Sequence, residues 1–224
     1  MKLIVFDVEG TLFQTLIRLP GAEIDSTIWQ GIAHRLGDRA IKEEVATHGK
    51  WGRGEYRNYM EWMKDTILIH KKYGLTGAMF RELIDSAAYN PNLADAIRRL
   101  DRTKYEPVLI SGGFRELAAR AQRDFGIIHA FAGCEYFFGC DDLLCAFNLL
   151  PCDFHGKIDF IHLMLREYGL DAKKDWIFVG DGLNDVPIAK EAPLSFGYRP
   201  RAGLREVVTH VIEDFADLNT FLVD

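Results

Sequence analysis

The amino-acid sequence predicts an α/β fold built on a doubly wound, Rossmann-like parallel sheet, with a small helical insertion after the first strand. From residue 91 onward, apolar runs of strand length alternate with helical patterns across short connections, which is typical of parallel sheets. Residues 15–90 instead show helical periodicity, and no strand-like run stands out there. We therefore expect a core made of residues 1–14 and 91–224 and an insertion made of residues 15–90.

The first expected strand covers residues 3–6, an unbroken apolar run rich in β-branched side chains. Such a run is typical of a strand buried on both faces. Asp7 and Glu9 follow it, and a turn is expected at Gly10 and Thr11. Open α/β sheets bind ligands beyond the carboxyl ends of their strands. The two carboxylates therefore indicate a site, although a capping Asp followed by a turn has the same local pattern.

The insertion is expected to be helical because apolar residues recur three and four positions apart. The three stripes are Ile28, Ile32 and Leu36; Tyr56, Tyr59, Met63 and Ile67; and Met79, Phe80, Leu83, Ile84 and Ala87. Stripes of this kind indicate helix packing rather than a cofactor site. Asn90 and Pro91 form a turn signal that marks the return to the core.

The core elements after the insertion follow from the same two patterns. Apolar runs predict strands at residues 107–110, 176–179, 194–196 and 210–212. Helical spacing predicts helices at residues 93–100, 114–125, 157–168 and 184–190, with a helix after each of the last two strands. Residues 127–150, which are aromatic and rich in cysteine, are compatible with a β-hairpin.

Polar residues recur at the ends of the expected core strands. Ser111 follows the second core strand, Asp181 and Asp185 follow the third, and Lys157 lies near the start of a helix. Right-handed crossovers would bring the strand ends at Asp7, Ser111 and Asp181 to one edge of the sheet. We therefore expect these side chains to form one site.

In this order, the acidic pair, the serine, the lysine and the acidic loop resemble the haloacid dehalogenase superfamily of phosphatases and phosphotransferases. The Ser-Gly-Gly-Phe and Gly-Asp-Gly-Leu-Asn-Asp sequences around Ser111 and Asp181 make the chain most similar to the phosphoserine-phosphatase branch. The resemblance covers nearly the whole chain. It implies a HAD-like core, and it implies that residues 15–90 form a helical cap over the catalytic face.

The resemblance also implies catalytic roles for three residues. Asp7 would be the nucleophile that forms an aspartyl-phosphate, Glu9 the general acid/base, and Lys157 the cation that offsets the charge of Asp7 and phosphate. Most of the superfamily has Asp where this chain has Glu9. Some relatives, including a phosphoserine:homoserine phosphotransferase, share the Asp-x-Glu sequence.

A Mg²⁺ site is implied by the same resemblance. Asp7, Asp181 and the backbone carbonyl of Glu9 would be direct ligands, with Asp185 nearby, since Mg²⁺ prefers oxygen ligands and few carboxylates. The alternative reading of the acidic loop is a turn followed by a helix cap.

The resemblance assigns substrate contacts as well. The candidates for binding phosphate are Ser111, the Gly112 backbone N–H and Asn184. The candidates for the rest of the substrate are Glu23 and Arg115. Where the family has an arginine, this chain has Met63 and Lys64, and lysine cannot bind a carboxylate in the bidentate way of arginine.

The expected function is therefore a Mg²⁺-dependent phosphomonoester hydrolase, phosphoserine-phosphatase-like, acting on a small phosphorylated metabolite. Two alternatives stay open. One is a phosphotransferase that passes the phosphoryl group to an alcohol acceptor such as homoserine. The other is a catalytically silent protein that binds a phosphate ligand.

Composition indicates where such a protein works. A net charge of −6 and the lack of a basic run give no sign of nucleic-acid binding. No apolar stretch reaches the ~20 residues of a membrane span. The chain starts directly in an expected core strand, so we expect no membrane association and a cytoplasmic protein.

All four cysteines fall within one segment, at Cys134, Cys140, Cys145 and Cys152. Their spacing is irregular and contains no Cys-x-x-Cys pair, so we expect thiols rather than a zinc site. An unusual metal site completed by His129 and His155 is the alternative.

Overall fold

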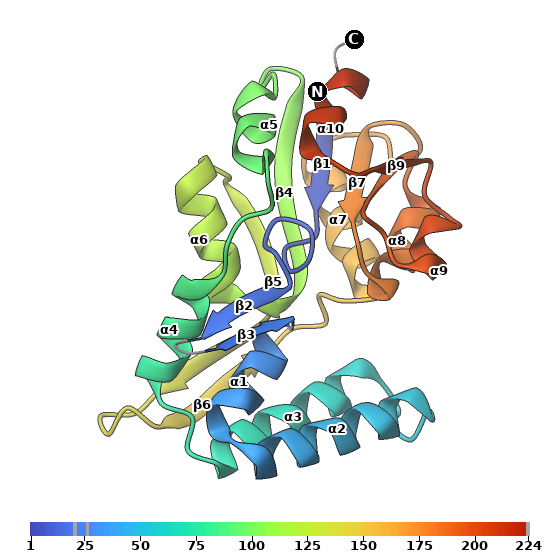
Figure 1. Ribbon diagram of the computed structural model, residues 1–224. Coiled ribbons are helices and arrows are strands. Elements are labelled where there is room, and N and C mark those ends of the chain that lie inside the picture. The colour runs from blue at the N-terminus through green and yellow to red at the C-terminus, as the bar shows by residue number, and fades with distance from the viewer. Residues whose placement is uncertain (20–21, 26, 223–224) are drawn as a thin grey trace. The chain divides into compact units, whose positions relative to one another are not determined.

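The computed structural model describes residues 1–19, 22–25 and 27–222 (Figure 1). The chain forms two compact units. Unit 1 comprises residues 1–14, 89–132 and 152–224. Unit 2 comprises residues 15–88 and 133–151. The expected division differs from this one mainly at residues 133–151, which the sequence pattern placed with the core.

The main sheet has seven strands in the order β6-β5-β4-β1-β7-β8-β9, of which β6 and the end of β5 belong to unit 2. Strand β1 pairs in parallel with β4 and with β7, and β8 and β9 continue in parallel beyond β7. The strands of this sheet are β1 Lys2–Phe6, β4 Tyr105–Phe114, β5 His129–Phe138, β6 Leu144–Leu149, β7 Trp176–Gly180, β8 Leu194–Tyr198 and β9 His210–Ile212. The predicted α/β class is confirmed. The sheet, predicted to be parallel, is mostly parallel, since β6 pairs antiparallel with β5.

Helices connect the strands of unit 1, as the alternating pattern predicted. They are α5 Leu93–Arg99, α6 Arg115–Phe125, α7 Gly156–Glu167, the short 3₁₀ helix η1 Leu183–Asp185, α8 Val186–Glu191, α9 Ala202–Arg205 and α10 Phe215–Phe221. Helix α6 ends where Gly126 adopts a left-handed φ of 62°. Such a residue is a common helix stop, because glycine has no Cβ to oppose this conformation.

Strand β1 is the centre of the hydrophobic core of unit 1. Its residues from Leu3 to Phe6 are fully buried, as expected for a strand covered on both faces. Leu3 and Val5 belong to one cluster with Ile161 and Leu165 of α7. Burial of each such side chain contributes roughly 1.5–3 kcal/mol to folding. This packing holds the carboxyl end of β1, and therefore Asp7, in a defined place.

Unit 2 is mostly helical and contains a small second sheet. Its helices are α1 Ile28–Leu36, α2 Asp38–Gly52, α3 Tyr59–Lys72 and α4 Gly77–Ser86. The side chains of Thr27, Asn58 and Thr76 cap α1, α3 and α4 by accepting backbone N–H bonds. Helices α1 and α2 pack through Ala33, Ala40 and their neighbours.

The expectation of an insertion without strands is wrong at its start. Strands β2 Leu16–Leu19 and β3 Ala22–Asp25 pair antiparallel. Each strand has only four residues, which is too short for the alternation of polar and apolar residues to stand out from a helical pattern.

The hairpin predicted within residues 127–150 is present, since β5 and β6 pair antiparallel. Its outer part belongs to unit 2 because it contacts the helices there. The backbone N–H of Leu144 donates to the carbonyl of Leu75 at 2.9 Å, and the Tyr136 hydroxyl lies 2.8 Å from Nδ1 of His70. Among the described residues, no helix is both long and apolar enough to cross a membrane.

Candidate active site

The loop after β1 is a tight turn that presents Asp7. The backbone carbonyl of Val8 accepts the N–H groups of Leu12 and Phe13 at 2.9 and 3.0 Å, and the Gly10 N–H donates to Phe13 at 2.8 Å. Gly10 has a φ of +90°, and a Cβ at this position would overlap the Asp181 carboxylate. Glycine is therefore required both by the backbone conformation and by the approach of Asp181.

Two polar side chains hold this loop in place. Thr11 is fully buried, and its hydroxyl donates to Oδ1 of Asp181 at 2.8 Å. The amide nitrogen of Asn90 donates to the backbone carbonyls of Gly10 and Thr11 at 3.1 and 2.7 Å. Sequence reasoning treated Asn90 only as part of a turn signal. Asn90 contacts residues 80 and 79 positions away in the chain, so no local sequence pattern could have revealed this second role.

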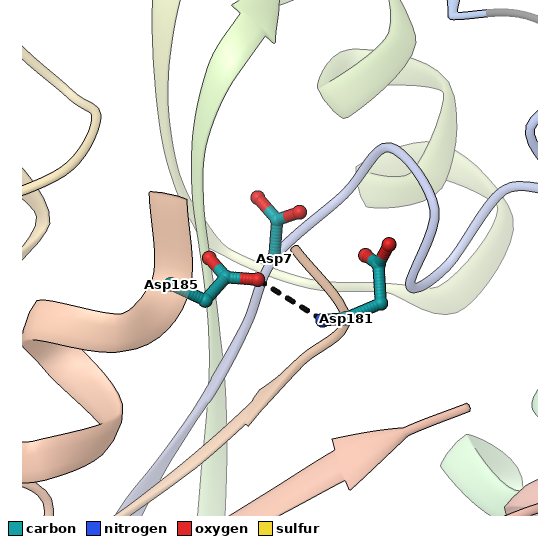
Figure 2. Close-up of side chains that lie close together, drawn as sticks. All are labelled: Asp7, Asp181 and Asp185. Atoms are coloured by element: carbon teal, nitrogen blue, oxygen red, sulfur yellow. Dashed lines mark hydrogen bonds between the residues drawn. The ribbon is translucent and has the colours of Figure 1, made fainter. Parts of the chain in front are cut away.

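Three carboxylates meet at the edge where β1 and β7 end (Figure 2). Asp7, Asp181 and Asp185 each offer an oxygen, and these oxygens lie within 4.8 Å of one another. The cluster is the one group of its kind found among the residues that the structure describes. The cysteine segment forms no such group there. A cluster of hard oxygen donors of this kind can bind a metal ion.

Asp185 also organises the loop that follows β7. Its Oδ2 accepts the backbone N–H groups of Asp181 and Gly182, both at 3.0 Å. Figure 2 shows the first of these two bonds. Asp185 is completely buried, so its carboxylate depends on these donors and on the Lys157 ammonium for the hydrogen bonds that water would otherwise supply.

Lys157 inserts a positive charge between the carboxylates. It lies in the first turn of α7 and is fully buried. Its ammonium nitrogen is 2.7 Å from Oδ1 of Asp7 and 2.5 Å from Oδ1 of Asp185. Oδ1 of Asp153 lies 3.6 Å away. A lysine is almost never fully buried without such partners.

The charges in this cluster do not balance, and the pKa values reflect this. Burial raises the pKa of Asp7 well above its usual value, against the attraction of Lys157, and the neighbouring carboxylates raise it further. Burial and the charge of Asp185 raise the pKa of Asp181 to about 7. Burial lowers the pKa of Lys157, but the surrounding carboxylates outweigh that effect and the pKa is raised. A bound cation would relieve the repulsion that remains, so the donor set fits a metal ion.

Two of the other predicted site residues lie beside Gly113. Ser111 is buried near the end of β4, and its Oγ accepts the Gly113 N–H at 3.0 Å; Gly112 lies between them. Oε2 of Glu9 lies 3.1 Å from where a Cβ on Gly113 would be. Glu9 and Ser111 therefore both lie next to Gly113. Lys157 instead contacts Asp7.

The remaining substrate candidates are Arg115, Glu23 and Asn184. Arg115 is the first residue of α6 and is exposed. The side chain of Glu23 lies outside the described residues, although its backbone belongs to β3. The Nδ2 of Asn184 donates to Oδ1 of Asp153 at 2.8 Å, so in this structure the Asn184 amide is hydrogen-bonded to a protein side chain.

Asp153 was missed by sequence reasoning. It precedes Lys157 by four residues, and burial raises the pKa of its carboxyl, against the attraction of Lys157. An acidic residue four positions before a lysine at a helix start is a recognisable pairing signal. On its own, however, this signal occurs on many exposed helices.

Comparison with known proteins places this site in a family. A model of haloacid dehalogenase-like hydrolases matches residues 1–193. A phosphoserine phosphatase from Albidiferax ferrireducens is 24% identical over 219 residues, which cover 95% of this chain and 84% of the relative. A structure of a substrate-bound phosphoserine phosphatase complex superposes with a TM-score of 0.78 at 20% identity, covering 99% of this chain and 98% of the other.

A different kind of match covers only part of the chain. Ribonuclease 3 from Bordetella pertussis is 30% identical over 125 residues, which cover 49% of this chain and 48% of the relative. The family model extends much further, across the acidic pair, the serine, the lysine and the acidic loop. On that match and on the arrangement of these residues, the chain belongs to the haloacid dehalogenase-like hydrolase family.

Proposed function

We propose that this protein is a Mg²⁺-dependent phosphatase that hydrolyses a small phosphorylated metabolite through an aspartyl-phosphate on Asp7. One observation carries the proposal. The buried Lys157 ammonium lies 2.7 Å from Oδ1 of Asp7, at a sheet edge that also holds Asp181 and Asp185. Phosphoryl transfer needs positive charge beside an anionic nucleophile, which Lys157 supplies directly and which the acidic cluster would supply by holding Mg²⁺. The likeness to phosphoserine phosphatases supports the same reaction.

The chemistry proceeds in two steps. In the first, an Asp7 carboxylate oxygen bonds to phosphorus, the bond from phosphorus to the substrate alcohol oxygen breaks, and Glu9 gives that oxygen a proton. In the second, Glu9 takes a proton from water as the water oxygen attacks phosphorus. The bond to Asp7 then breaks, inorganic phosphate leaves, and the Asp7 carboxylate is restored.

The remaining residues would hold the metal ion or bind the phosphoryl oxygens. Bound Mg²⁺ would supply positive charge to the phosphoryl oxygens. Asp7, Asp181 and the Glu9 carbonyl would hold it directly. Both oxygens of Asp185 already have partners, so Asp185 would act through water. The Ser111 hydroxyl and the Gly112 N–H would bind phosphoryl oxygens.

Substrate choice would come from unit 2, acting as a cap, and from Arg115. Glu23 would accept a cationic group of the substrate, and the exposed Arg115 would bind an anionic one. Met63, which stands where the family has an arginine, is buried in α3, and Lys64 is exposed. We therefore propose a small phosphorylated metabolite and leave phosphoserine as one member of the test panel.

The test is release of inorganic phosphate from a panel of phosphomonoesters, with Mg²⁺ and with EDTA. The panel contains phosphoserine, phosphothreonine, sugar phosphates, nucleotides and aromatic phosphates. We expect turnover that EDTA abolishes and Mg²⁺ restores. Asp7→Asn should abolish it with folding retained, while Asp95→Asn, at an exposed residue, should retain it. Unchanged turnover in Asp7→Asn would overturn the proposal.

Glu9 favours a second candidate function, phosphotransfer, since relatives with that activity share the Asp-x-Glu sequence. Product analysis in the presence of serine or homoserine separates the two. A phosphorylated acceptor formed at the expense of inorganic phosphate would assign phosphotransfer. Binding of Mg²⁺ and inorganic phosphate with no turnover across the panel would instead assign a silent binding protein.

A further inference from the structure

Asp153 is a further carboxylate beside the proposed catalytic residues, and the proposed reaction gives it no role. Its side chain is only 9% exposed. Oδ1 accepts a hydrogen bond from Nδ2 of Asn184 at 2.8 Å and lies 3.6 Å from the Lys157 ammonium. A buried carboxylate is costly unless it is paired, so the contacts with Asn184 and Lys157 must offset the cost of burying Asp153.

The Asn184 amide connects Asp153 to the acidic loop. Its nitrogen donates to Asp153, while its Oδ1 lies against Gly182, where an added Cβ would overlap it. Gly182 in turn donates its N–H to Oδ2 of Asp185 at 3.0 Å. The Asn184 amide therefore links Asp153, which lies just before α7, to the loop that carries Asp181 and Asp185.

The backbone around Asp153 is strained. Phe154, the next residue, has a φ of +49°, in the left-handed region that bulky residues rarely adopt. The turn is closed by the Gly156 N–H, which donates to the Asp153 carbonyl at 2.9 Å. The Asp153 carboxylate also lies so close to Gly112 that a Cβ there would overlap it. Strain of this kind persists where surrounding contacts impose it, often at functional sites.

We propose that Asp153 is a positioning residue that holds the Asn184 amide, and through it fixes the loop of residues 181–185 against the start of α7. As a statement about catalysis, this inference rests on the proposed phosphatase function. As a statement about the loop, it stands on the contacts alone. Asp153 acts through hydrogen bonding to Asn184, so an uncharged acceptor of the same shape can replace it.

Two substitutions separate the hydrogen bond from the charge. Asp153→Asn keeps an oxygen that can accept from Asn184, whereas Asp153→Ala removes it. We expect Asp153→Ala to lower kcat about 10- to 100-fold with little change in KM, as is typical for outer residues that orient a site. Asp153→Asn should retain most of kcat. Equal losses in both variants would show that the charge matters instead and would overturn the proposal.

A double-mutant cycle tests the route through Asn184. Asn184→Ala should lower kcat as Asp153→Ala does, and the double variant should be no slower than Asn184→Ala alone, because both changes break one interaction. Additive losses in the double variant would overturn the route. Asp95→Ala, at an exposed residue of α5, is the control for a lost aspartate and should leave kcat unchanged.

Amide hydrogen exchange gives a readout that needs no turnover. A peptide covering residues 181–185 should exchange faster in Asp153→Ala than in wild-type protein, and as in wild type in Asp153→Asn and Asp95→Ala. Unchanged exchange in Asp153→Ala would overturn the proposal even if no substrate is found. Wild-type protein without turnover but with faster loop exchange in Asp153→Ala would count against the phosphatase function alone.

Discussion

The ammonium nitrogen of Lys157 lies 2.5 Å from Oδ1 of Asp185, and neither side chain is exposed to solvent. The same nitrogen contacts Asp7 at 2.7 Å. Transfer of these charges from water into the protein is costly, and only their mutual attraction and hydrogen bonds offset that cost. The pairing therefore makes both the acidic cluster and the local fold depend on one lysine.

Lys157→Met should destabilise the protein by about 3–5 kcal/mol, because it leaves buried carboxylates without their counter-charge. It should also abolish turnover. Urea unfolding followed by circular dichroism measures the first effect. Lys174→Met breaks an exposed ion pair with Asp171 and should change the free energy of unfolding by at most ~1 kcal/mol. Equal stability of Lys157→Met and wild-type protein would contradict the prediction.

Gly10→Ala should cost more stability than the same change at Gly37. Both glycines have a positive φ that favours glycine, +90° at Gly10 and +95° at Gly37. A Cβ on Gly37 meets nothing within 4 Å, whereas one on Gly10 would overlap the Asp181 carboxylate. Gly37, with a ψ of 178°, lies in a region that is essentially restricted to glycine, so Gly37→Ala should cost roughly 1–3 kcal/mol from backbone strain alone.

The difference in free energy of unfolding between these two variants isolates the contact with Asp181. We also expect Gly10→Ala to weaken the binding of Mg²⁺, measured by titration calorimetry, because Asp181 must move. Equal unfolding free energies would contradict the close approach of the two residues.

Acid should lower the free energy of unfolding through protonation of His70. Burial lowers the pKa of His70 below its ordinary value of 6.5, despite the nearby Glu44 carboxylate. Glu44 lies on α2 at 3.7 Å from Nε2, which is too long for a hydrogen bond, and the Tyr136 hydroxyl on β5 lies 2.8 Å from Nδ1. The unfolded chain therefore binds this proton more readily than the folded protein.

The sign of the effect follows from that difference. The stability that the neutral, buried His70 contributes is complete above pH 6.5 and is lost progressively as the pH falls below 6.5. Denaturant unfolding between pH 7.5 and 5, run on wild type and His70→Asn, measures it. The variant should show a shallower loss of stability. His34→Asn, at an exposed histidine, should keep the wild-type slope; a matching slope in His70→Asn would refute the prediction.

The four cysteines should divide into two reactive and two protected thiols. Cys140 and Cys145 are exposed, while Cys134 and Cys152 are buried. Burial and the nearby Asp153 carboxylate raise the pKa of the Cys152 thiol to about 12, which leaves little reactive thiolate. A thiol-disulfide reagent at pH 8 should modify two thiols rapidly in native protein and four in denaturant.

A double variant with serine at positions 140 and 145 is the control for this assignment. It should show no rapid modification in the native state. A third rapid thiol in wild-type protein would contradict the burial of Cys134 or Cys152.

The sequence by itself determined the core elements and the residue types of the site. Strands β1, β4 and β7 were predictable because a strand covered on both faces reads as an apolar run. Asp7 and Asp181 were predictable because the carboxyl ends of parallel strands meet at one edge. These signals are local, and each lies within a few residues of chain.

Tertiary structure alone decided three features. The short strands β2 and β3 carry too little periodicity to be read from sequence. The hairpin of β5 and β6 joins unit 2 through contacts such as His70 with Tyr136, which are distant in the chain. Asp153 meets Asn184 only once α7 and the loop after β7 are both in place. The hairpin of β2 and β3 is local, but its strands are too short to show a period. The other two features depend on hydrogen bonds between segments that are distant in the chain, and these bonds form only through packing that no local pattern of residues encodes.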